Sequence, residues 1–254
     1  METVNSSRPL VPFGGKIRRA RLIGRRKRFL MDVEDASGPF TAHTNNTGTM
    51  LGLLRPGSEV LLSVSDAPSR KHACTVEAVR LRTSGFPGSG TQNSGNPGFW
   101  VGVNTAMPTR ILKAAWAAGL MPECAGYETF KTEPRFAEGR LDALFTGPAG
   151  ELYVETKNVT MVEDCQAQFP DAPSERASKH MGELARIARG GARAAVFFAV
   201  QRPDGQCFGP AEAVDPEYAR AFRQALAAGV EAWAYVVDVA EDGYRLSRRL
   251  RVAS

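Results

Sequence analysis

The chain has 254 residues, 43% of them hydrophobic, with a formal net charge of +5 and a pI near 9.2. This is ordinary globular composition, sufficient for two modest domains with their own cores. The four cysteines are scattered without a CxxC pair, which argues against a disulfide framework or a zinc site. No apolar run is long enough for a signal peptide or a membrane span, so we expect a cytoplasmic protein without a membrane partner.

A basic run lies near the N-terminus. From Lys16 to Arg28 the chain has eight Lys or Arg residues and no Asp or Glu. Such side chains neutralise phosphates and release counterions, which gives DNA affinity without sequence reading. We assign DNA contacts to the last part of the run, which holds Arg25, Arg26, Lys27 and Arg28. The alternative interpretation is an ordinary solvated basic face.

An uncharged segment divides the chain into two parts. Residues 84–98 are dense in Gly, Ser, Pro and Asn, and they cannot bury enough apolar surface to offset their ordering entropy. We predict a flexible linker there. Residues 1–83 contain short strand-like runs between turn residues and no convincing helix, which predicts a small barrel or sandwich. Residues 99–254 mix helical and strand-like patterns, which predicts an α/β domain.

A predicted hairpin in the second part carries the chemistry. Two strand-like runs flank the turn residues 147–150, and this spacing pairs Thr146 with Glu151 and sets Asp142 opposite Glu155. Alternation along the second strand places Tyr153, Glu155 and Lys157 on one face. The hairpin therefore predicts two facing carboxylates with a lysine beside them.

Facing carboxylates on neighbouring strands repel, and a divalent cation would compensate. Mg²⁺ binds one or two carboxylates and keeps several waters, so we expect Asp142 and Glu155 to hold it. Lys157 could orient a water or stabilise charge on a phosphate, which completes the minimum apparatus for metal-assisted phosphodiester hydrolysis. The alternative is a solvated hairpin face with a Glu–Lys cross-link.

The chain resembles the sugar fermentation stimulation protein A family over nearly its whole length outside the linker. The resembling runs include RLIGRRKRFLMDVE, WVGVNT, RLDALF, YVETKNVT and FPDAPSERASKHMGEL. The resemblance implies an OB-like N-terminal barrel followed by a PD-(D/E)XK, restriction-endonuclease-like α/β domain. It also implies DNA binding, with a role in regulating sugar-utilisation genes. Asp142, Glu155 and Lys157 match the positions of the nuclease motif.

Other residues have weaker assignments. Gln201 follows a buried strand whose end could meet the Asp142–Glu155 face, so we include it among the catalytic candidates; a strand-end turn contact is the alternative. Lys179 is assigned a phosphate contact. His180 is either a second phosphate contact or a partly buried helix residue, and we favour the buried residue. OB folds also use aromatic platforms for unpaired bases, and only Phe29 and Phe40 are available near the basic run.

Two functions remain from the sequence. One is a DNA-binding protein whose nuclease-like domain is mainly a binding surface, and the other is a Mg²⁺-dependent nuclease acting on a particular DNA structure. The intact Asp142, Glu155 and Lys157 favour the enzyme. Ala114, which stands on the first helix of the second part where many relatives are expected to have an acid, favours the binder with weakly held Mg²⁺.

Overall fold

The computed structural model describes residues 8–82, 98–136 and 139–253, so the predicted linker at 84–98 lies outside the described residues except for Gly98. The first part of the chain forms β1 (Val11–Pro12), β2 (Lys16–Arg26), β3 (Leu30–Asp35), β4 (Gly38–His43), β5 (Glu59–Val64), β6 (Cys74–Leu81) and β7 (Phe99–Gly102). The middle part forms α1 (Met107–Ala117), η1 (Pro122–Cys124), β8 (Thr129–Thr132), β9 (Arg135–Phe136), β10 (Gly139–Arg140), β11 (Ala143–Gly147) and β12 (Gly150–Val159). The last part forms β13 (Met161–Glu163), β14 (Gln166–Phe169), α2 (Glu175–Arg189), β15 (Arg193–Val200), β16 (Cys207–Pro210), α3 (Pro216–Ala227), β17 (Glu231–Ala240) and β18 (Gly243–Val252).

Strands β2 to β6 form a closed barrel. β2 pairs with β3 and β5, β3 pairs with β4, and β5 pairs with β6, all antiparallel. A parallel bridge between His43 and Thr75 joins β4 to β6 and closes the ring. Closure removes free sheet edges and encloses a core that includes Met31, Val60 and Val76. The barrel expected for the first part of the chain is therefore present.

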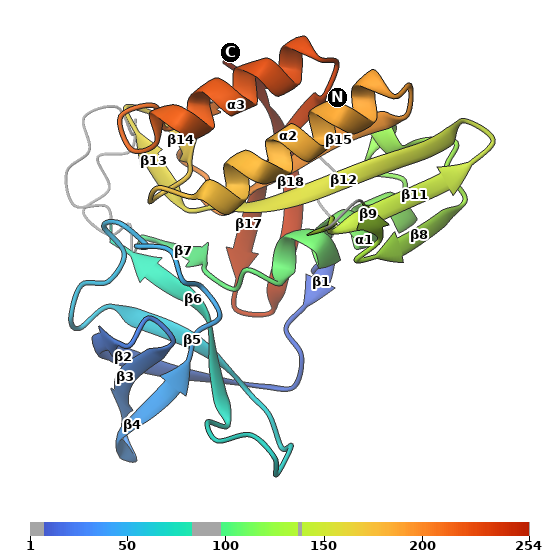
Figure 1. The fold of residues 1–254 in the computed structure, drawn as a ribbon. Coiled ribbons are helices and arrows are strands. Elements are labelled where there is room, and N and C mark those ends of the chain that lie inside the picture. The colour runs from blue at the N-terminus through green and yellow to red at the C-terminus, as the bar shows by residue number, and fades with distance from the viewer. Residues whose placement is uncertain (1–7, 83–97, 137–138, 254) are drawn as a thin grey trace.

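The second part is a mixed sheet with helices on both faces (Figure 1). β12, β15 and β17 run parallel, and β11 and β8 extend the sheet antiparallel beyond β12. Alternation along β15 separates two cores: Phe197 packs in a cluster with Ile111 of α1, and Phe198 packs in a cluster with Phe222 of α3. α2 lies beside α3 on that second face, so the sheet is covered on both sides.

The barrel and the α/β part are joined at several places. β7 pairs with β6 of the barrel and also with β17, and β1 pairs with β18. The loop after β4 reaches the segment before α2, where Met50 N donates to Asp171 Oδ2 at 2.7 Å and Thr49 Oγ1 donates to the Asp171 carbonyl at 2.6 Å. These contacts hold one end of the barrel against the start of α2.

In the residues that the structure describes, we find no helix with both the length and the apolar character needed to span a membrane.

Candidate functional site

The hairpin of β11 and β12 has the predicted register. Thr146 pairs with Glu151, and the ladder runs back to the pair Ala143–Val154. Asp142 lies just before β11, where its Oδ2 accepts hydrogen bonds from Thr156 N at 2.7 Å and Thr156 Oγ1 at 2.8 Å. The pairing of β11 with β12 ends at Val154, so at Thr156 the Asp142 carboxylate accepts the backbone hydrogen bond in place of β11. Thr156 Oγ1 also lies 3.0 Å from Thr109 Oγ1 of α1.

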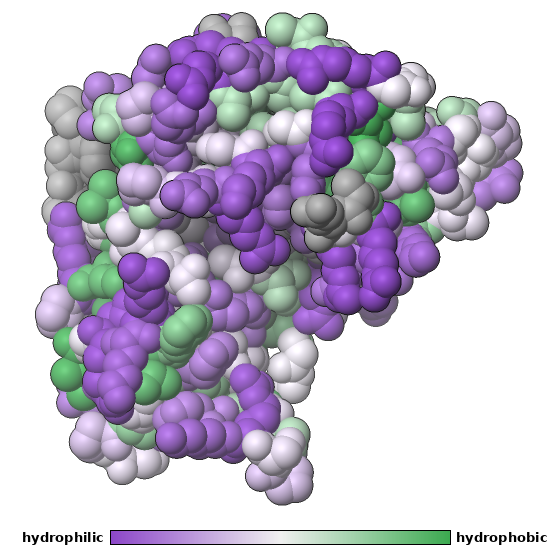
Figure 2. Space-filling model, in the orientation of Figure 1, coloured by the Kyte–Doolittle hydropathy of each residue, from purple (hydrophilic) through white to green (hydrophobic). Residues whose placement is uncertain are grey.

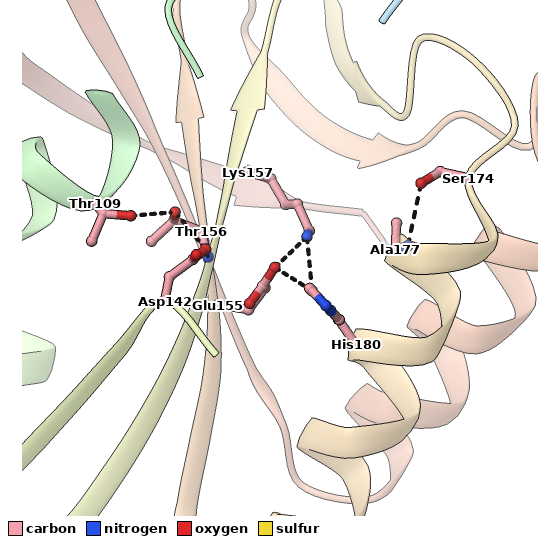
Figure 3. Close-up of polar contacts among 8 residues, drawn as sticks. All are labelled: Thr109, Asp142, Glu155, Thr156, Lys157, Ser174, Ala177 and His180. Atoms are coloured by element: carbon pink, nitrogen blue, oxygen red, sulfur yellow. Dashed lines mark hydrogen bonds and ion pairs between the residues drawn. The ribbon is translucent and has the colours of Figure 1, made fainter. Parts of the chain in front are cut away.

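Glu155 and Lys157 share the opposite face of β12, as the alternation predicts (Figure 3). Lys157 Nζ donates to Glu155 Oε1 at 2.6 Å. His180 of α2 joins this pair, because its Nδ1 lies within hydrogen-bonding reach of the same Oε1 and 3.4 Å from Lys157 Nζ. The Glu155 side chain is 3% exposed and that of Lys157 11%, so the group is shielded from water.

The two carboxyl groups have opposite pKa directions. Burial raises the pKa of Asp142, the charge of Glu155 raises it further, and the bonds from Thr156 offset only part of this. Burial also acts to raise the pKa of Glu155, but the charge of Lys157 and the contact with His180 outweigh it and the pKa is lowered. Glu155 is therefore held ionised beside an Asp142 whose ionisation is opposed.

Two buried polar atoms at this place have no partner among the described residues: Glu155 Oε2 and the hydroxyl of Tyr218 on α3. Burial raises the pKa of Tyr218 well above its ordinary value, and the Glu155 charge adds to the effect. An unpaired buried carboxylate oxygen is costly, and carboxylate oxygens are the ligands that Mg²⁺ and Ca²⁺ prefer.

Asp142 and Glu155 are the carboxylates here that could hold a divalent cation, although the described residues contain no group of three or more His, Cys, Asp or Glu side chains arranged to hold a metal. Two carboxylates suit an ion that keeps several water ligands. α1, on the other face of the sheet, adds no Asp or Glu to this set.

The segment before α2 explains why His180 points into the site. Ser174 Oγ accepts a hydrogen bond from Ala177 N at 3.2 Å and caps the helix, while Asp215 Oδ2 accepts one from Ser174 N at 2.8 Å. The helix start is thus fixed to the start of α3. From this start His180 falls on the buried face of α2 and Lys179 on the exposed face.

Gln201 does not join Asp142 and Glu155. Its Nε2 donates to Asn158 Oδ1 at 2.8 Å, on the face of β12 that carries Thr156, and its backbone N–H donates to the carbonyl of Val159. Its buried Oε1 has no partner among the described residues.

The four basic residues assigned to DNA have different surroundings. The Arg25 guanidinium donates to the carbonyls of Asn46, Gly48 and Arg28, so it binds the barrel's own backbone. Arg26 pairs with Asp32 at 2.7 Å. Lys27 and Arg28 are exposed, and neither side chain forms an ion pair with another described residue. Lys179 is likewise exposed and unpaired within the described chain.

His180 and Tyr218 are the site residues that the sequence patterns did not assign. His180 reaches Glu155 only because α2 packs against β12, a contact between residues 25 positions apart. Tyr218 follows the helix start at Asp215 and occupies the first buried position of α3. The helical patterns of the sequence carried no signal for which buried residue meets the carboxylates.

Comparisons with known proteins agree with this architecture. Residues 106–243 match the family model described as the sugar fermentation stimulation protein RE domain, and residues 23–85 match the SfsA N-terminal OB domain. A sugar fermentation stimulation protein homolog from Syntrophobacter fumaroxidans is 50% identical over 233 residues, covering 92% of this chain and 84% of the relative. A homolog from Maridesulfovibrio salexigens is 45% identical over 251 residues, covering 98% and 99%.

Among solved structures, that of Pyrococcus furiosus SfsA in complex with Ca²⁺ is similar to this chain, with a TM-score of 0.85 at 26% identity, over 98% of this chain and all of the other. The family models and this likeness confirm the fold class expected from the sequence, an OB barrel followed by a restriction-endonuclease-like domain.

Proposed function

The chain belongs to the sugar fermentation stimulation protein family, and from this membership and the site's geometry we propose that it binds DNA. The observation that carries the proposal is the presence of exposed cations without acidic partners on both parts of the molecule. Lys27 and Arg28 project from the barrel, and Arg176 and Lys179 project from the start of α2. Cations left unpaired by the protein are available to phosphates.

The position of these cations supports the same proposal. The contacts of Asp171 with Thr49 and Met50 hold the barrel loop against the start of α2, so the two basic groups belong to neighbouring elements. Figure 2 shows hydrophilic residues over the α2 face and on the barrel, with a notch between the barrel and the domain above it. A duplex laid along this face would meet cations from both parts.

We further propose that Asp142 and Glu155 hold a divalent cation, Mg²⁺ in the cell. The unpartnered Oε2 of Glu155 supports it, and so does the pKa of Asp142, which burial and then the Glu155 charge raise. The Ca²⁺ bound by the relative from Pyrococcus furiosus supports a divalent ion in general. When bound, the cation would neutralise charge on a phosphoryl group and bring water to it.

A second candidate function, phosphodiester hydrolysis, is favoured by the position of Lys157. Its ammonium lies at Glu155, where it can stabilise charge that develops on a phosphate as water adds to phosphorus and the bridging oxygen leaves. His180 holds the same carboxylate oxygen and so orients Glu155. With two carboxylates and no acid from α1, we expect cleavage by the natural protein to be slow or undetectable.

A role in regulating sugar-utilisation genes forms part of the proposal, and its support is the name that the relatives carry. DNA binding is compatible with such a role.

One experiment tests binding and separates it from hydrolysis. Labelled single-stranded, duplex and branched DNAs are incubated with the protein in EDTA, Ca²⁺, Mg²⁺ or Mn²⁺, and complexes and products are measured on separate gels. We expect complexes in every condition and little product. Vigorous cleavage that EDTA stops and that Lys157→Ala abolishes would make hydrolysis the main function. The absence of any complex would refute DNA binding.

A further inference from the structure

Exposed apolar side chains lie on the hairpin of β2 and β3 and on the loop after β4. In the described residues, the large hydrophobic side chains that are exposed are Ile23 at 44%, Phe29 at 48% and Leu51 at 61%. Single exposed hydrophobics need no explanation, but these three come from adjoining segments. The backbone carbonyl of Phe29 accepts a hydrogen bond from Thr44 N at 2.8 Å. The Arg25 guanidinium donates to the carbonyl of Arg28 and to the carbonyls of Asn46 and Gly48, in the loop before Leu51.

The turn that carries Phe29 has a backbone that its residues do not favour. Lys27 and Arg28 adopt φ values of 51° and 59°, in the left-handed region where Gly or Asn is the usual choice. The Arg25 guanidinium stabilises this conformation by donating to the carbonyl of Arg28 at 2.9 and 2.7 Å. The turn thus presents two exposed cationic side chains, Lys27 and Arg28, on a backbone that Arg25 stabilises.

Ile23 is exposed because side chains alternate along β2, where Ala20 and Leu22 are buried and Arg21 and Ile23 face outward. The pairing of β2 with β3 shifts between Leu22 and Gly24, which leaves Ile23 as the extra residue. Leu22 is buried and the next residue turns outward. The bulge leaves Ile23 without a partner residue in β3.

Together Ile23, Lys27, Arg28, Phe29 and Leu51 form what we call the barrel end: apolar side chains beside two unpaired cations. Base faces are apolar and become accessible only where bases are unpaired, and phosphates follow each base along the strand. We propose that the barrel end binds unpaired bases of DNA, with Phe29 stacked on one base and Lys27 and Arg28 on the adjoining phosphates. This inference rests on the proposed DNA binding and names its substrate class: DNA in which a duplex is interrupted by unpaired bases.

One stacked base is expected, and not a row of them. The other aromatic residue of this region, Phe40, is covered by the Arg18 guanidinium, which lies 4.0 Å from its ring centroid. The single proposed base therefore stacks on Phe29. Because Thr49 and Met50 contact Asp171, a base held there lies on the same side of the molecule as the start of α2.

The test compares two labelled DNAs in EDTA by fluorescence anisotropy: a continuous duplex, and the same duplex with a short gap of unpaired bases. Phe29→Ala is expected to weaken binding of the gapped DNA roughly tenfold and to leave duplex binding unchanged, since it removes one stacked base. Phe29→Tyr keeps the ring and is the matched control, with affinity like the natural protein. Phe29→Leu keeps apolar bulk without the ring and should behave like Phe29→Ala.

The side chain is half exposed, so each variant should fold, which its thermal melting curve checks. Equal losses on both DNAs, no loss on either, or full affinity in Phe29→Leu would overturn the stacking of an unpaired base while DNA binding still stands. Failure of the natural protein to bind either DNA would instead remove the proposed function, and this inference with it.

Discussion

Lys157 Nζ lies 2.6 Å from Glu155 Oε1, while Oε2 of the same carboxylate is buried without a partner among the described residues. One carboxylate oxygen is thus bound by the Lys157 ammonium, and the other has no hydrogen-bond donor among the described residues. Asp142, whose Oδ2 is taken by Thr156, adds a second carboxylate whose pKa burial and the Glu155 charge raise. Without a bound cation, Glu155 Oε2 has no partner and the charge of Glu155 opposes the ionisation of Asp142.

Asp142→Asn should raise the melting temperature of the cation-free protein and remove its stabilisation by Mg²⁺ or Mn²⁺. The amide oxygen still accepts from Thr156, but the repulsion with Glu155 and one charged ligand are lost. For the natural protein, a cation at a hundred times its dissociation constant should stabilise the fold by about 2.7 kcal/mol.

Calorimetry with EDTA and with added cation makes this comparison. Glu133→Gln, which changes an exposed acid paired with Arg140, is the matched control and should keep the gain. An undiminished gain in Asp142→Asn would exclude Asp142 as a ligand.

Lys157→Met should destabilise the protein by about 3 kcal/mol at neutral pH, because it leaves a buried carboxylate without its main cation. Burial acts to raise the pKa of Glu155. Lys157 and His180 outweigh this effect, and the pKa lies below its usual 4.5. The pair therefore stabilises the fold above pH 4.5, and this contribution is lost as the pH falls through the lowered folded-state pKa.

Urea unfolding from neutral pH to pH 3 should accordingly show the natural protein and Lys157→Met converging in acid. Arg223→Met removes an exposed pair with Glu212 and should leave the stability at neutral pH nearly unchanged, because solvent screens such a pair. A difference for Lys157→Met that persists unchanged in acid would show that the lysine acts through packing and not through its charge.

Asp171→Ala should weaken the attachment of the barrel to the start of α2. It removes the acceptor of Met50 N, a buried residue, and we expect a loss of about 2 kcal/mol in urea unfolding. Asp171→Asn retains an acceptor oxygen and should lose less. Gly48→Ala tests the same contact from the barrel side, because its Cβ would lie 2.6 Å from Asp171 Oδ1. Unchanged stability in both Asp171→Ala and Gly48→Ala would mean that this contact does not hold the two parts together.

The hairpin was predictable from the sequence because local rules determine it. Turn residues between Thr146 and Glu151 set the register, and period-two alternation then placed Glu155 and Lys157 on one face. The two-domain fold followed from resemblance, since propensity alone left the strand order of the second part open.

Contacts between distant elements were not predictable in the same way. His180 meets Glu155 through the packing of a helix on a strand, and Gln201 turns to Asn158 because its strand ends beside that residue. The sequence predicted phosphate contacts for Arg25, Arg26, Lys27 and Arg28 alike. In the structure, acids from β3 and from the turn before β18 pair with Arg26 and Arg19, and Arg25 binds backbone carbonyls of a loop that approaches it only in the closed barrel.

The salt dependence of duplex affinity tests the central claim, DNA binding through cations of both parts, most directly. Duplex affinity of the natural protein should fall steeply as salt rises, and Lys27→Ser, Arg28→Ser and Lys179→Ser combined should lower the slope of the log–log plot by about 3. Arg220→Ser with Arg223→Ser, on exposed cations that have acidic partners on or beside α3, should leave it unchanged. An identical slope in the triple variant, or no duplex binding by the natural protein at low salt, would contradict the account.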